Sequence, residues 1–422
     1  MHSVTNAIPT GTIASIPAKA HAHRALICAA LANSPSTILL SRTSKDIDAT
    51  MDSLRGLGAH VVYENKIVTV TPGPAPVKGN VVPHESGTTL RLLLPVAASI
   101  CNDVDVDAKG RLPDRPLEPM LGEMKAHGVT FSQDKPPFTM MGRLQGGNFS
   151  MVGDVSSQFF SGLLLAAPQI GLSTITSTTP LQSSDYVTLT TETMRDFGVE
   201  VEHTLPDTNI NEAFTVPFGA SFIGRDNYQI EGDWSNAAIW MVAAGMTGKP
   251  ITITGMNKNS VQADRRIIQV MIDAGCDVVW DGMNVTVTGR ASKPIHADLE
   301  QMPDMLPVMA ALACSISGES SFVKGARLRL KESDRLVAVA NLVRDLGGTV
   351  REEGDDLYII GSGILKGGHG DCVNDHRLVM AGTLMALISE NPVTLKDSEA
   401  ITKSYPDFFE DWNLLGGDAH GI

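Results

Sequence analysis

The sequence has little of what marks a membrane, secreted or nucleic-acid-binding protein. Its 422 residues include 33 Lys or Arg against 47 Asp or Glu, which gives a formal net charge of -14. A general nucleic-acid binder needs a basic surface that displaces counterions, so this composition argues against that class. No apolar run reaches the length of a membrane span, and residues 1–17 lack the basic start and apolar run of a signal peptide. We therefore expect a cytoplasmic protein.

Cysteine is scarce, and the motifs of several common active sites are missing. The cysteines are Cys28, Cys101, Cys276, Cys314 and Cys372. They form no CxxC pair, and their odd number favours reduced thiols over a disulfide or zinc framework. The segment GMTGKP lacks the spacing of a nucleotide-binding P-loop, and the sequence has no HExxH or Cys/His cluster. The sequence therefore predicts no metal site.

A glycine that ends an amphipathic segment and precedes a β-prone run recurs along the chain. The six glycines are Gly58, Gly128, Gly198, Gly275, Gly347 and Gly416. They stand 70, 70, 77, 72 and 69 residues apart. Glycine after the last helical turn is the usual C-cap, so a single case would mean little. A nearly constant period of about 70 residues indicates an internal repeat.

Each repeat also contains a second helix that is rich in small residues and apolar nearly all round. These helices read RALICAALA, TTLRLLLPVAASI, SQFFSGLLLAAP, SNAAIWMVAAGM, DMLPVMAALACSI and HRLVMAGTLMALI. Helices of this kind belong inside a domain. With the strands between them, each repeat should hold two helices and about four strands. Three repeats per domain predict an α/β protein with two similar domains, residues 18–229 and residues 1–17 plus 230–422, which can hinge.

The starts of the six apolar helices are unusually polar. They read PAKAHAHR, HESGTTLR, GDVSSQF, GDWSNAA, QMPDMLP and NDHR. Hydroxyl, carboxylate and amide side chains at such positions are first of all N-caps. Caps do not need cations, however, and these starts also carry Lys19, Arg24, Arg91, His376 and Arg377. Helix N-termini with basic side chains bind anions. Helices that point the same way would therefore converge on one anion-binding cleft.

Other segments add candidates, each with a plainer alternative. Residues 156–158 offer three side-chain donors at a helix start, which suits a phosphate monoester or a double cap. The segment GRLPDRP, residues 110–116, is either a stiffened loop that presents two arginines or an exposed loop. Tyr186 fits a lid hydroxyl or core packing. Lys403 lies just before a proline near the C-terminus, where a surface lysine is the ordinary interpretation.

The segment RLRLKESDRL, residues 327–336, concentrates charge where a helix is expected to begin near Glu332. Lys331 and Arg335 are like charges four residues apart, and cations at a helix N-terminus oppose its dipole. A bound anion would reverse both penalties. Asp304 and Glu332 both fall at helix starts beside cations, so each is either a cap or a proton carrier.

Taken in order, these segments resemble a known family over nearly the whole chain. The matching pieces are PAKAHAHRAL, ESGTTLR, GRLPDRP, VSSQF, SSDY, RLKESDR, NDHR and ITKSYPDFF. They are similar to the 5-enolpyruvylshikimate-3-phosphate synthases, which are enolpyruvyl transferases. The resemblance implies two domains of three βαβαββ units each, an inside-out α/β barrel, with the active site in the cleft between them.

The resemblance also implies a reaction. Phosphoenolpyruvate would donate its enolpyruvyl group to the 5-hydroxyl of shikimate 3-phosphate through a tetrahedral intermediate, releasing phosphate, as a step of aromatic amino acid biosynthesis. It implies a monomer with no metal or organic cofactor. The positions that match phosphoenolpyruvate contacts are Lys19, Gly87, Thr88, Arg115, Gln158, Arg335, Arg377 and Lys403. Those that match shikimate 3-phosphate contacts are Arg24, Ser156, Ser157, Gln158, Ser183, Asp304 and Lys331. Asp304 matches the base for the 5-hydroxyl and Glu332 a proton relay, and Lys19 joins them as a catalytic residue.

The sequence departs from the family pattern in places and leaves two alternatives. Ala20 stands where the family usually has serine, so we expect weaker binding of shikimate 3-phosphate. Glu85 and Arg327 also differ from some relatives. The first alternative is the sister enzyme that acts on UDP-N-acetylglucosamine, although GRLPDRPLEPM lacks the cysteine of its loop. The second is a non-catalytic repeat protein that binds anions, in which Asp304 and Glu332 are only caps.

Overall fold

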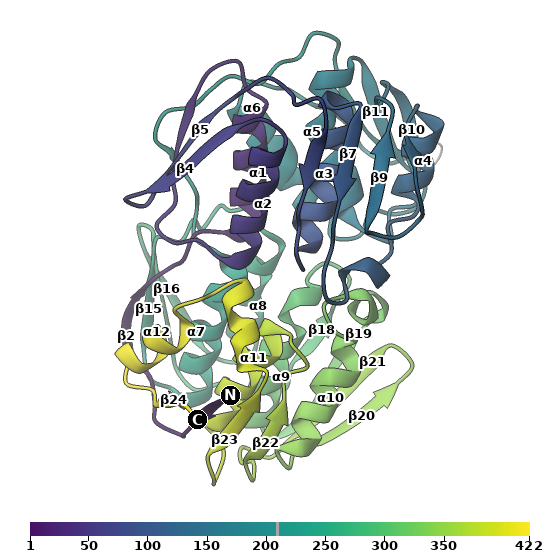
Figure 1. Ribbon diagram of the computed structural model, residues 1–422. Helices are drawn as coiled ribbons and strands as arrows, with labels where there is room; N and C mark the ends of the chain where they lie inside the picture. Colours follow the sequence, from purple (N-terminus) through teal and green to yellow (C-terminus); the bar gives the residue numbers. More distant parts are fainter. Residues whose placement is uncertain (208–210) are drawn as a thin grey trace. The chain divides into compact units, whose positions relative to one another are not determined.

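The computed structural model describes residues 1–207 and 211–422, which form two compact units (Figure 1). Unit 1 consists of Met1–Ile16 and Glu231–Ile422, and unit 2 of Pro17–Ile230. The chain therefore begins in unit 1, forms the whole of unit 2 and then returns. The two termini lie side by side in unit 1, because the first strand pairs with the last (Figure 1).

The described residues form six four-stranded sheets, three in each unit. In unit 2 the orders are β14(Tyr228–Gln229)-β3(Ser36–Leu39)-β5(Ile67–Thr71)-β4(His60–Glu64), β6(Gly79–Val81)-β7(Asp103–Val106)-β9(Phe138–Met141)-β8(Thr130–Phe131) and β10(Gly147–Met151)-β11(Ser173–Ser177)-β13(Glu212–Val216)-β12(Glu202–Thr204). In unit 1 they are β16(Asp277–Asp281)-β17(Asn284–Thr288)-β15(Ile251–Thr254)-β2(Gly11–Ala14), β18(His296–Asp298)-β19(Gly318–Val323)-β21(Asp356–Gly361)-β20(Thr349–Glu353) and β22(Gly368–Asp371)-β23(Val393–Lys396)-β1(His2–Val4)-β24(Ala419–Gly421). Each sheet pairs one outer strand in parallel and its other strands antiparallel.

Each repeat contains one buried and one outer α-helix, as the sequence predicts. The buried helices are α1(Lys19–Ala30), α3(Gly87–Ile100) and α5(Ser157–Ile170) in unit 2, and α7(Trp234–Thr247), α9(Leu306–Ser315) and α11(His376–Ala386) in unit 1. The outer helices are α2(Lys45–Gly56), α4(Met120–Ala126), α6(Asp185–Asp196), α8(Ile267–Asp273), α10(Arg335–Asp345) and α12(Phe408–Leu414). Short 3-10 turns are η1(Leu112–Asp114), η2(Ala263–Arg266), η3(Pro303–Met305), η4(Ala326–Leu330) and η5(Ser398–Lys403).

The repeat glycines lie where the outer helices end. All six have a positive φ, between 86° and 104°. Gly58 illustrates the requirement, because a Cβ there would also collide with the carbonyl oxygen of Pro74. Only glycine adopts this backbone without strain, so the period of about 70 residues follows from how each outer helix turns into its next strand.

Each unit has a hydrophobic core built around its apolar helices. All ten residues of α9 are buried, as are the residues of α7 from Trp234 to Met246 except Ser235. In unit 2, α3 and α5 approach closely at Gly162, where a Cβ would lie 2.5 Å from the carbonyl oxygen of Arg91. Among the described residues, no helix combines the length and apolar character needed to cross a membrane.

The start of α10 differs from the expectation. The helix begins at Arg335 instead of near Glu332, and residues Ala326–Leu330 form the 3-10 turn η4. The side chain of Asp334 caps α10 by accepting a hydrogen bond from the backbone N–H of Val337 at 3.3 Å. Aspartate is among the preferred N-cap residues. With Asp334 as the cap, Lys331 and Glu332 lie in the connection that precedes the helix.

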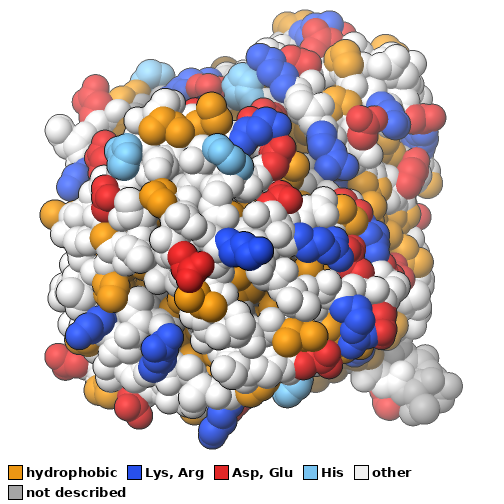
Figure 2. Space-filling model, turned by 90° about the horizontal axis from the view of Figure 1, so that it is seen from below, with side chains coloured by type: hydrophobic (Ala, Val, Ile, Leu, Met, Phe, Trp, Pro, Cys, Tyr) orange, Lys and Arg blue, Asp and Glu red, His pale blue; other side chains and the backbone are white. Residues whose placement is uncertain are grey.

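Charged side chains of both signs are interspersed on the face of the molecule seen in Figure 2. Blue Lys and Arg side chains alternate there with red Asp and Glu among uncharged surface. A surface of this kind is ordinary for a globular protein. The groups that distinguish this chain are instead the partly or fully buried charges at the starts of its apolar helices.

Candidate functional site

In unit 2 the starts of α1, α3 and α5 are joined by side-chain contacts, which we call the unit 2 cluster: Lys19, Asp46, Gly87, Thr88, Thr89, Arg91, Arg115 and Gln158. Lys19 Nζ binds Asp46 Oδ2 at 2.8 Å. Thr89 donates to the backbone oxygen of Asp46 at 3.3 Å. Gln158 Nε2 donates to Thr88 Oγ1 at 2.9 Å. Five residues that the sequence nominates for phosphoenolpyruvate thus lie in one cluster.

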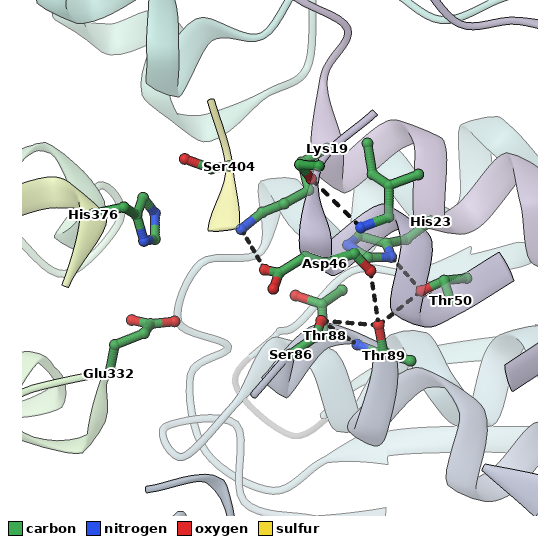
Figure 3. Close-up of polar contacts among 12 residues, drawn as sticks. Lys19, His23, Asp46, Thr50, Ser86, Thr88, Thr89, Glu332, His376 and Ser404 are labelled. Carbon is green, nitrogen blue, oxygen red and sulfur yellow. Dashed lines mark hydrogen bonds and ion pairs between the residues drawn. The ribbon is translucent and has the colours of Figure 1, made fainter. Parts of the chain in front are cut away.

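Lys19 is oriented by a polar network beneath it (Figure 3). Thr89 contacts Thr50 at 2.7 Å, and Thr50 contacts His23 Nδ1 at 2.6 Å. Ser86 caps α3 by accepting from the N–H of Thr89 at 3.2 Å. Burial, reinforced by the positive charge of Lys19, holds the pKa of His23 well below its ordinary value. His23 is therefore neutral near pH 7 and adds no charge beneath the Lys19 ammonium.

Gly87, at the start of α3, leaves the space that the guanidinium of Arg115 occupies. A Cβ on Gly87 would lie 2.5 Å from Arg115 Nη1, so any larger residue would displace the guanidinium. Arg91 holds the same loop, because its Nη2 donates to the carbonyl oxygen of Pro116 at 2.9 Å. Its Nη1 also donates to Gln158 Oε1 at 3.1 Å. The loop is thus tied to both α3 and α5.

The proposed shikimate 3-phosphate residues of unit 2 occupy special backbone positions. Ser156 is the N-cap of α5 and accepts from the N–H of Gln158 at 3.3 Å. Ser157 is the first residue of that helix, and its hydroxyl-bearing side chain is buried. Ser183 is also buried and has a positive φ of 53°. The capping interpretation therefore holds for Ser156, while a phosphate contact by any of the three stays a prediction.

Arg24 is more enclosed than a substrate-binding arginine is expected to be. Its Nε donates to Thr190 at 2.7 Å, and its Nη1 donates to the carbonyl oxygen of Ala20 at 2.7 Å. Its Nη2 donates to Ser161 at 3.2 Å and to the carbonyl oxygen of Tyr186 at 2.9 Å. These bonds use four of the five N–H groups. Arg24 therefore fastens α1 to α5 and α6, and any contact with a substrate carboxylate would use the N–H that remains.

In unit 1 a second cluster surrounds Arg335, and we call it the unit 1 cluster: Asp304, Lys331, Glu332, Arg335, Asp375 and Arg377. Arg335 is 1% exposed. It binds Asp304 at 2.5 Å, Glu332 at 2.6 Å and Asp375 at 2.8 Å. The expected repulsion between Lys331 and Arg335 is present, but three carboxylates surround Arg335 and offset it. A bound anion is not needed to stabilise this cation.

The charges in the unit 1 cluster shift one another's protonation. Burial favours the neutral form of Asp304, but Lys331, Arg335 and Arg377 outweigh it and hold the pKa of Asp304 below its usual range. Lys331 Nζ lies 3.2 Å from Asp304 Oδ1. Burial lowers the pKa of Lys331, against the opposing effect of Asp304. Asp304 is therefore ionised at neutral pH.

Arg377 and Lys403 are both fixed by backbone oxygens in unit 1. Arg377 Nη1 donates to the carbonyl oxygen of Ser235 at 2.9 Å, and the backbone N–H of Arg377 donates to Asp375 Oδ1 at 3.0 Å. Lys403 Nζ donates to the carbonyl oxygen of Asn374 at 2.8 Å. Lys403 is buried, so its interpretation as a surface lysine is wrong. Its neighbour Asn374 directly precedes Asp375, the N-cap of α11.

Sequence reasoning missed the carboxylates that pair with the nominated cations. Asp46 stands in the first turn of α2 and Asp375 is the N-cap of α11, so both pass for ordinary capping residues. The one sequence signal is their position beside helix starts that are already rich in charge. Asp375 lies within the nominated segment NDHR, where only His376 and Arg377 were singled out.

Comparisons with known proteins agree with this architecture. Residues 7–412 match the family model described as EPSP synthase (3-phosphoshikimate 1-carboxyvinyltransferase). The chain is 36% identical over 413 residues to a 3-phosphoshikimate 1-carboxyvinyltransferase of Clostridium kluyveri, covering 97% of this chain and 95% of that protein. It is 34% identical over 417 residues to that of Methanocorpusculum labreanum, covering 97% of each.

A solved structure supports the fold separately. An EPSP synthase of Acinetobacter baumannii superposes with a TM-score of 0.80 and 23% identity, covering 100% of this chain and 99% of that one. At that identity the likeness bears on the fold alone. It confirms the predicted α/β fold of two similar three-repeat domains.

Proposed function

The chain belongs to the EPSP synthase (3-phosphoshikimate 1-carboxyvinyltransferase) family, and from this premise we propose that it transfers the enolpyruvyl group of phosphoenolpyruvate to the 5-hydroxyl of shikimate 3-phosphate. The hydroxyl oxygen adds to C2 of phosphoenolpyruvate while C3 gains a proton, which gives a tetrahedral intermediate. Loss of a proton from the C3 methyl group and cleavage of the bond from C2 to the phosphate oxygen then give 5-enolpyruvylshikimate 3-phosphate and inorganic phosphate.

The observation that best supports the proposal is that Arg335 binds both carboxylates proposed to transfer protons. Arg335 binds Asp304 at 2.5 Å and Glu332 at 2.6 Å. The reaction needs one group that takes the proton of the 5-hydroxyl and another that delivers a proton to C3 and later removes one. Proton transfer requires carboxyls at fixed positions with neighbours that tune their pKa values. Asp304 is the proposed base and Glu332 the proposed relay.

The remaining nominated residues are proposed to hold the two anionic substrates. For phosphoenolpyruvate they are Lys19, Gly87, Thr88, Arg115, Gln158, Arg335, Arg377 and Lys403. For shikimate 3-phosphate they are Ser156, Ser157, Gln158, Ser183 and Lys331, with Asp304 at the 5-hydroxyl and Arg24 at the carboxylate. Hydrogen bonds to charged groups contribute about 1.5–3 kcal/mol each, so several on one dianion outweigh the internal pairs that they replace.

Lys19 illustrates such an exchange. Its ammonium is paired with Asp46 at 2.8 Å, and the Lys19 and Asp46 side chains keep 18% and 15% of their surface exposed. A partly buried pair of this kind can release the ammonium to a phosphate or carboxylate, while Asp46 keeps it aligned beforehand. We propose that Lys19 also stabilises the charge that develops on the phosphate as the bond to C2 breaks.

The test is acceptor-dependent release of phosphate from phosphoenolpyruvate. We expect release with shikimate 3-phosphate and none with UDP-N-acetylglucosamine or without an acceptor. Release that needs the UDP-sugar would assign the chain to the sister activity. No release with any acceptor, from a protein with an intact fold, would leave the non-catalytic anion-binding alternative.

A further inference from the structure

Unit 1 contains a buried carboxyl group that the proposed chemistry does not use. Asp264 lies on η2 and is 1% exposed. Its Oδ2 accepts a hydrogen bond from the hydroxyl of Ser235. Its Oδ1 is buried and has no hydrogen-bond partner within residues 1–207 and 211–422. Burying a carboxylate with an unpaired oxygen is costly, so this group should have a role that offsets the cost.

Ser235, in the first turn of α7, connects this carboxyl to the unit 1 cluster. Its hydroxyl donates to Asp264, and its backbone oxygen accepts from Arg377 Nη1 at 2.9 Å. The Nε of Arg377 is buried and, within the described part of the chain, has no hydrogen-bond partner. One residue therefore sets the position of Arg377 relative to Asp264, and neither charge is fully neutralised by hydrogen bonds.

The charged groups that face Asp264 come from several elements. Asp304 on η3 and Asp233, the N-cap of α7, disfavour its ionised form, whereas Arg377 on α11 favours it. The helix α8, which also packs against η2, has Asp273 as its single charged residue, and that side chain is exposed. Burial first, and then Asp304, raise the pKa of Asp264 to about 6. Asp264 therefore changes charge near pH 6.

We propose that Asp264 is a positioning residue for Arg377 whose charge controls how tightly Arg377 binds phosphoenolpyruvate. When Asp264 is neutral, the positive charge of the Arg377 guanidinium is free to attract the substrate anion. Ionised Asp264 attracts the guanidinium and repels the incoming anion. The inference rests on the proposed function, because Arg377 is assigned to phosphoenolpyruvate there. From the interaction of unit charges in a partly polar interior, we expect about a three- to tenfold effect on affinity.

The experiment compares Asp264→Asn with the wild type from pH 5 to pH 8.5 at saturating shikimate 3-phosphate. Asparagine keeps an acceptor for Ser235 but has no charge. We expect the wild-type KM for phosphoenolpyruvate divided by that of the variant to rise from about 1 at pH 5 to about three- to tenfold at pH 8, with a midpoint near 6, while kcat stays within about twofold. The ratio removes the titration of the substrate itself, which is common to both enzymes.

Asp411→Asn is the matched control. Asp411 is also a buried carboxyl of unit 1 that accepts from a hydroxyl, that of Tyr405 at 2.7 Å. The wild-type KM for phosphoenolpyruvate divided by that of Asp411→Asn should not change with pH. A flat ratio for Asp264→Asn, or a higher KM in that variant at pH 8, overturns the inference.

Ser235→Ala gives a second, independent test. It removes the hydroxyl that stabilises ionised Asp264 but keeps the backbone oxygen that binds Arg377. The rise of KM for phosphoenolpyruvate should therefore move to higher pH, and an unmoved rise contradicts the proposal even if Asp264→Asn fails to fold. Failure of the proposed function is a separate outcome, because the wild type would then release no phosphate with shikimate 3-phosphate.

Discussion

Replacing Arg335 by glutamine should destabilise unit 1 severely. The arginine is 1% exposed and binds three carboxylates, one of which, Asp375, is fully buried. Removing one partner from a buried ion pair costs about 3–5 kcal/mol, because it leaves uncompensated charge inside the protein. Several carboxylates lose their partner here, so we expect a loss at the upper end of that range.

The stability lost in Arg335→Gln should depend on pH, because Asp304 is protonated in acid. In the wild type Arg335 helps to hold the pKa of Asp304 below its ordinary value. A lowered folded-state pKa stabilises the fold above the unfolded pKa of about 3.9, and this contribution disappears as pH falls through the folded-state pKa. The variant loses part of it. The difference between variant and wild type should therefore be full at pH 7 and should shrink only below about pH 4, as the pH falls toward the folded-state pKa of Asp304.

Tryptophan fluorescence during urea unfolding provides the assay. The four tryptophans, at positions 234, 240, 280 and 412, all belong to unit 1, so their signal reports that unit alone. Arg344→Gln is the matched control on the same helix, because Arg344 binds Glu352 at 2.8 Å at the surface. Exposed pairs contribute about 0–1 kcal/mol. Equal urea midpoints for Arg335→Gln and Arg344→Gln at pH 7 would refute the reasoning.

Three further predictions concern catalysis, substrate binding and packing. Asp304→Asn and Glu332→Gln should each lower kcat by at least about 100-fold with an unchanged fold, and a wild-type rate would remove that residue from the mechanism. Ala20→Ser should lower the KM for shikimate 3-phosphate by supplying a hydroxyl, and an unchanged KM counts against this idea. Gly162→Ala should destabilise unit 2 by about 1–3 kcal/mol, since its Cβ would lie 2.5 Å from a backbone oxygen of α3; unaltered thermal unfolding followed by circular dichroism would contradict that contact.

The repeat architecture could be predicted because its signals are local. Gly58 and its five counterparts each follow an outer helix and have a positive φ. Because this backbone conformation favours glycine, the end of each outer helix can be recognised in the sequence. The apolar helices are equally visible, because a helix buried on all sides must be apolar on all sides. The polar starts of those helices likewise drew attention to Lys19, Gln158 and Arg377.

The pairing of the charges could not be predicted in the same way. Lys19 and Asp46 are 27 residues apart, and Arg335 and Asp375 are 40 apart. The first contact depends on how the two helices of one repeat pack together, and the second on how one repeat packs against the next. A local sequence pattern contains no information about either. For the same reason the sequence suggested repulsion at Arg335, whereas three carboxylates surround it. Sequence reasoning also placed the start of α10 too early, because the N-cap of this helix is Asp334.

The central claim is transfer of an enolpyruvyl group by cleavage of the bond between C2 and the phosphate oxygen. Phosphoenolpyruvate that carries oxygen-18 in the bridging position tests it directly in the presence of the wild-type protein and shikimate 3-phosphate. Mass spectrometry should find the label in the released phosphate and the enolpyruvyl group on the shikimate product. Unlabelled phosphate, with the label left in pyruvate, would mean that the phosphorus–oxygen bond breaks and would contradict the account.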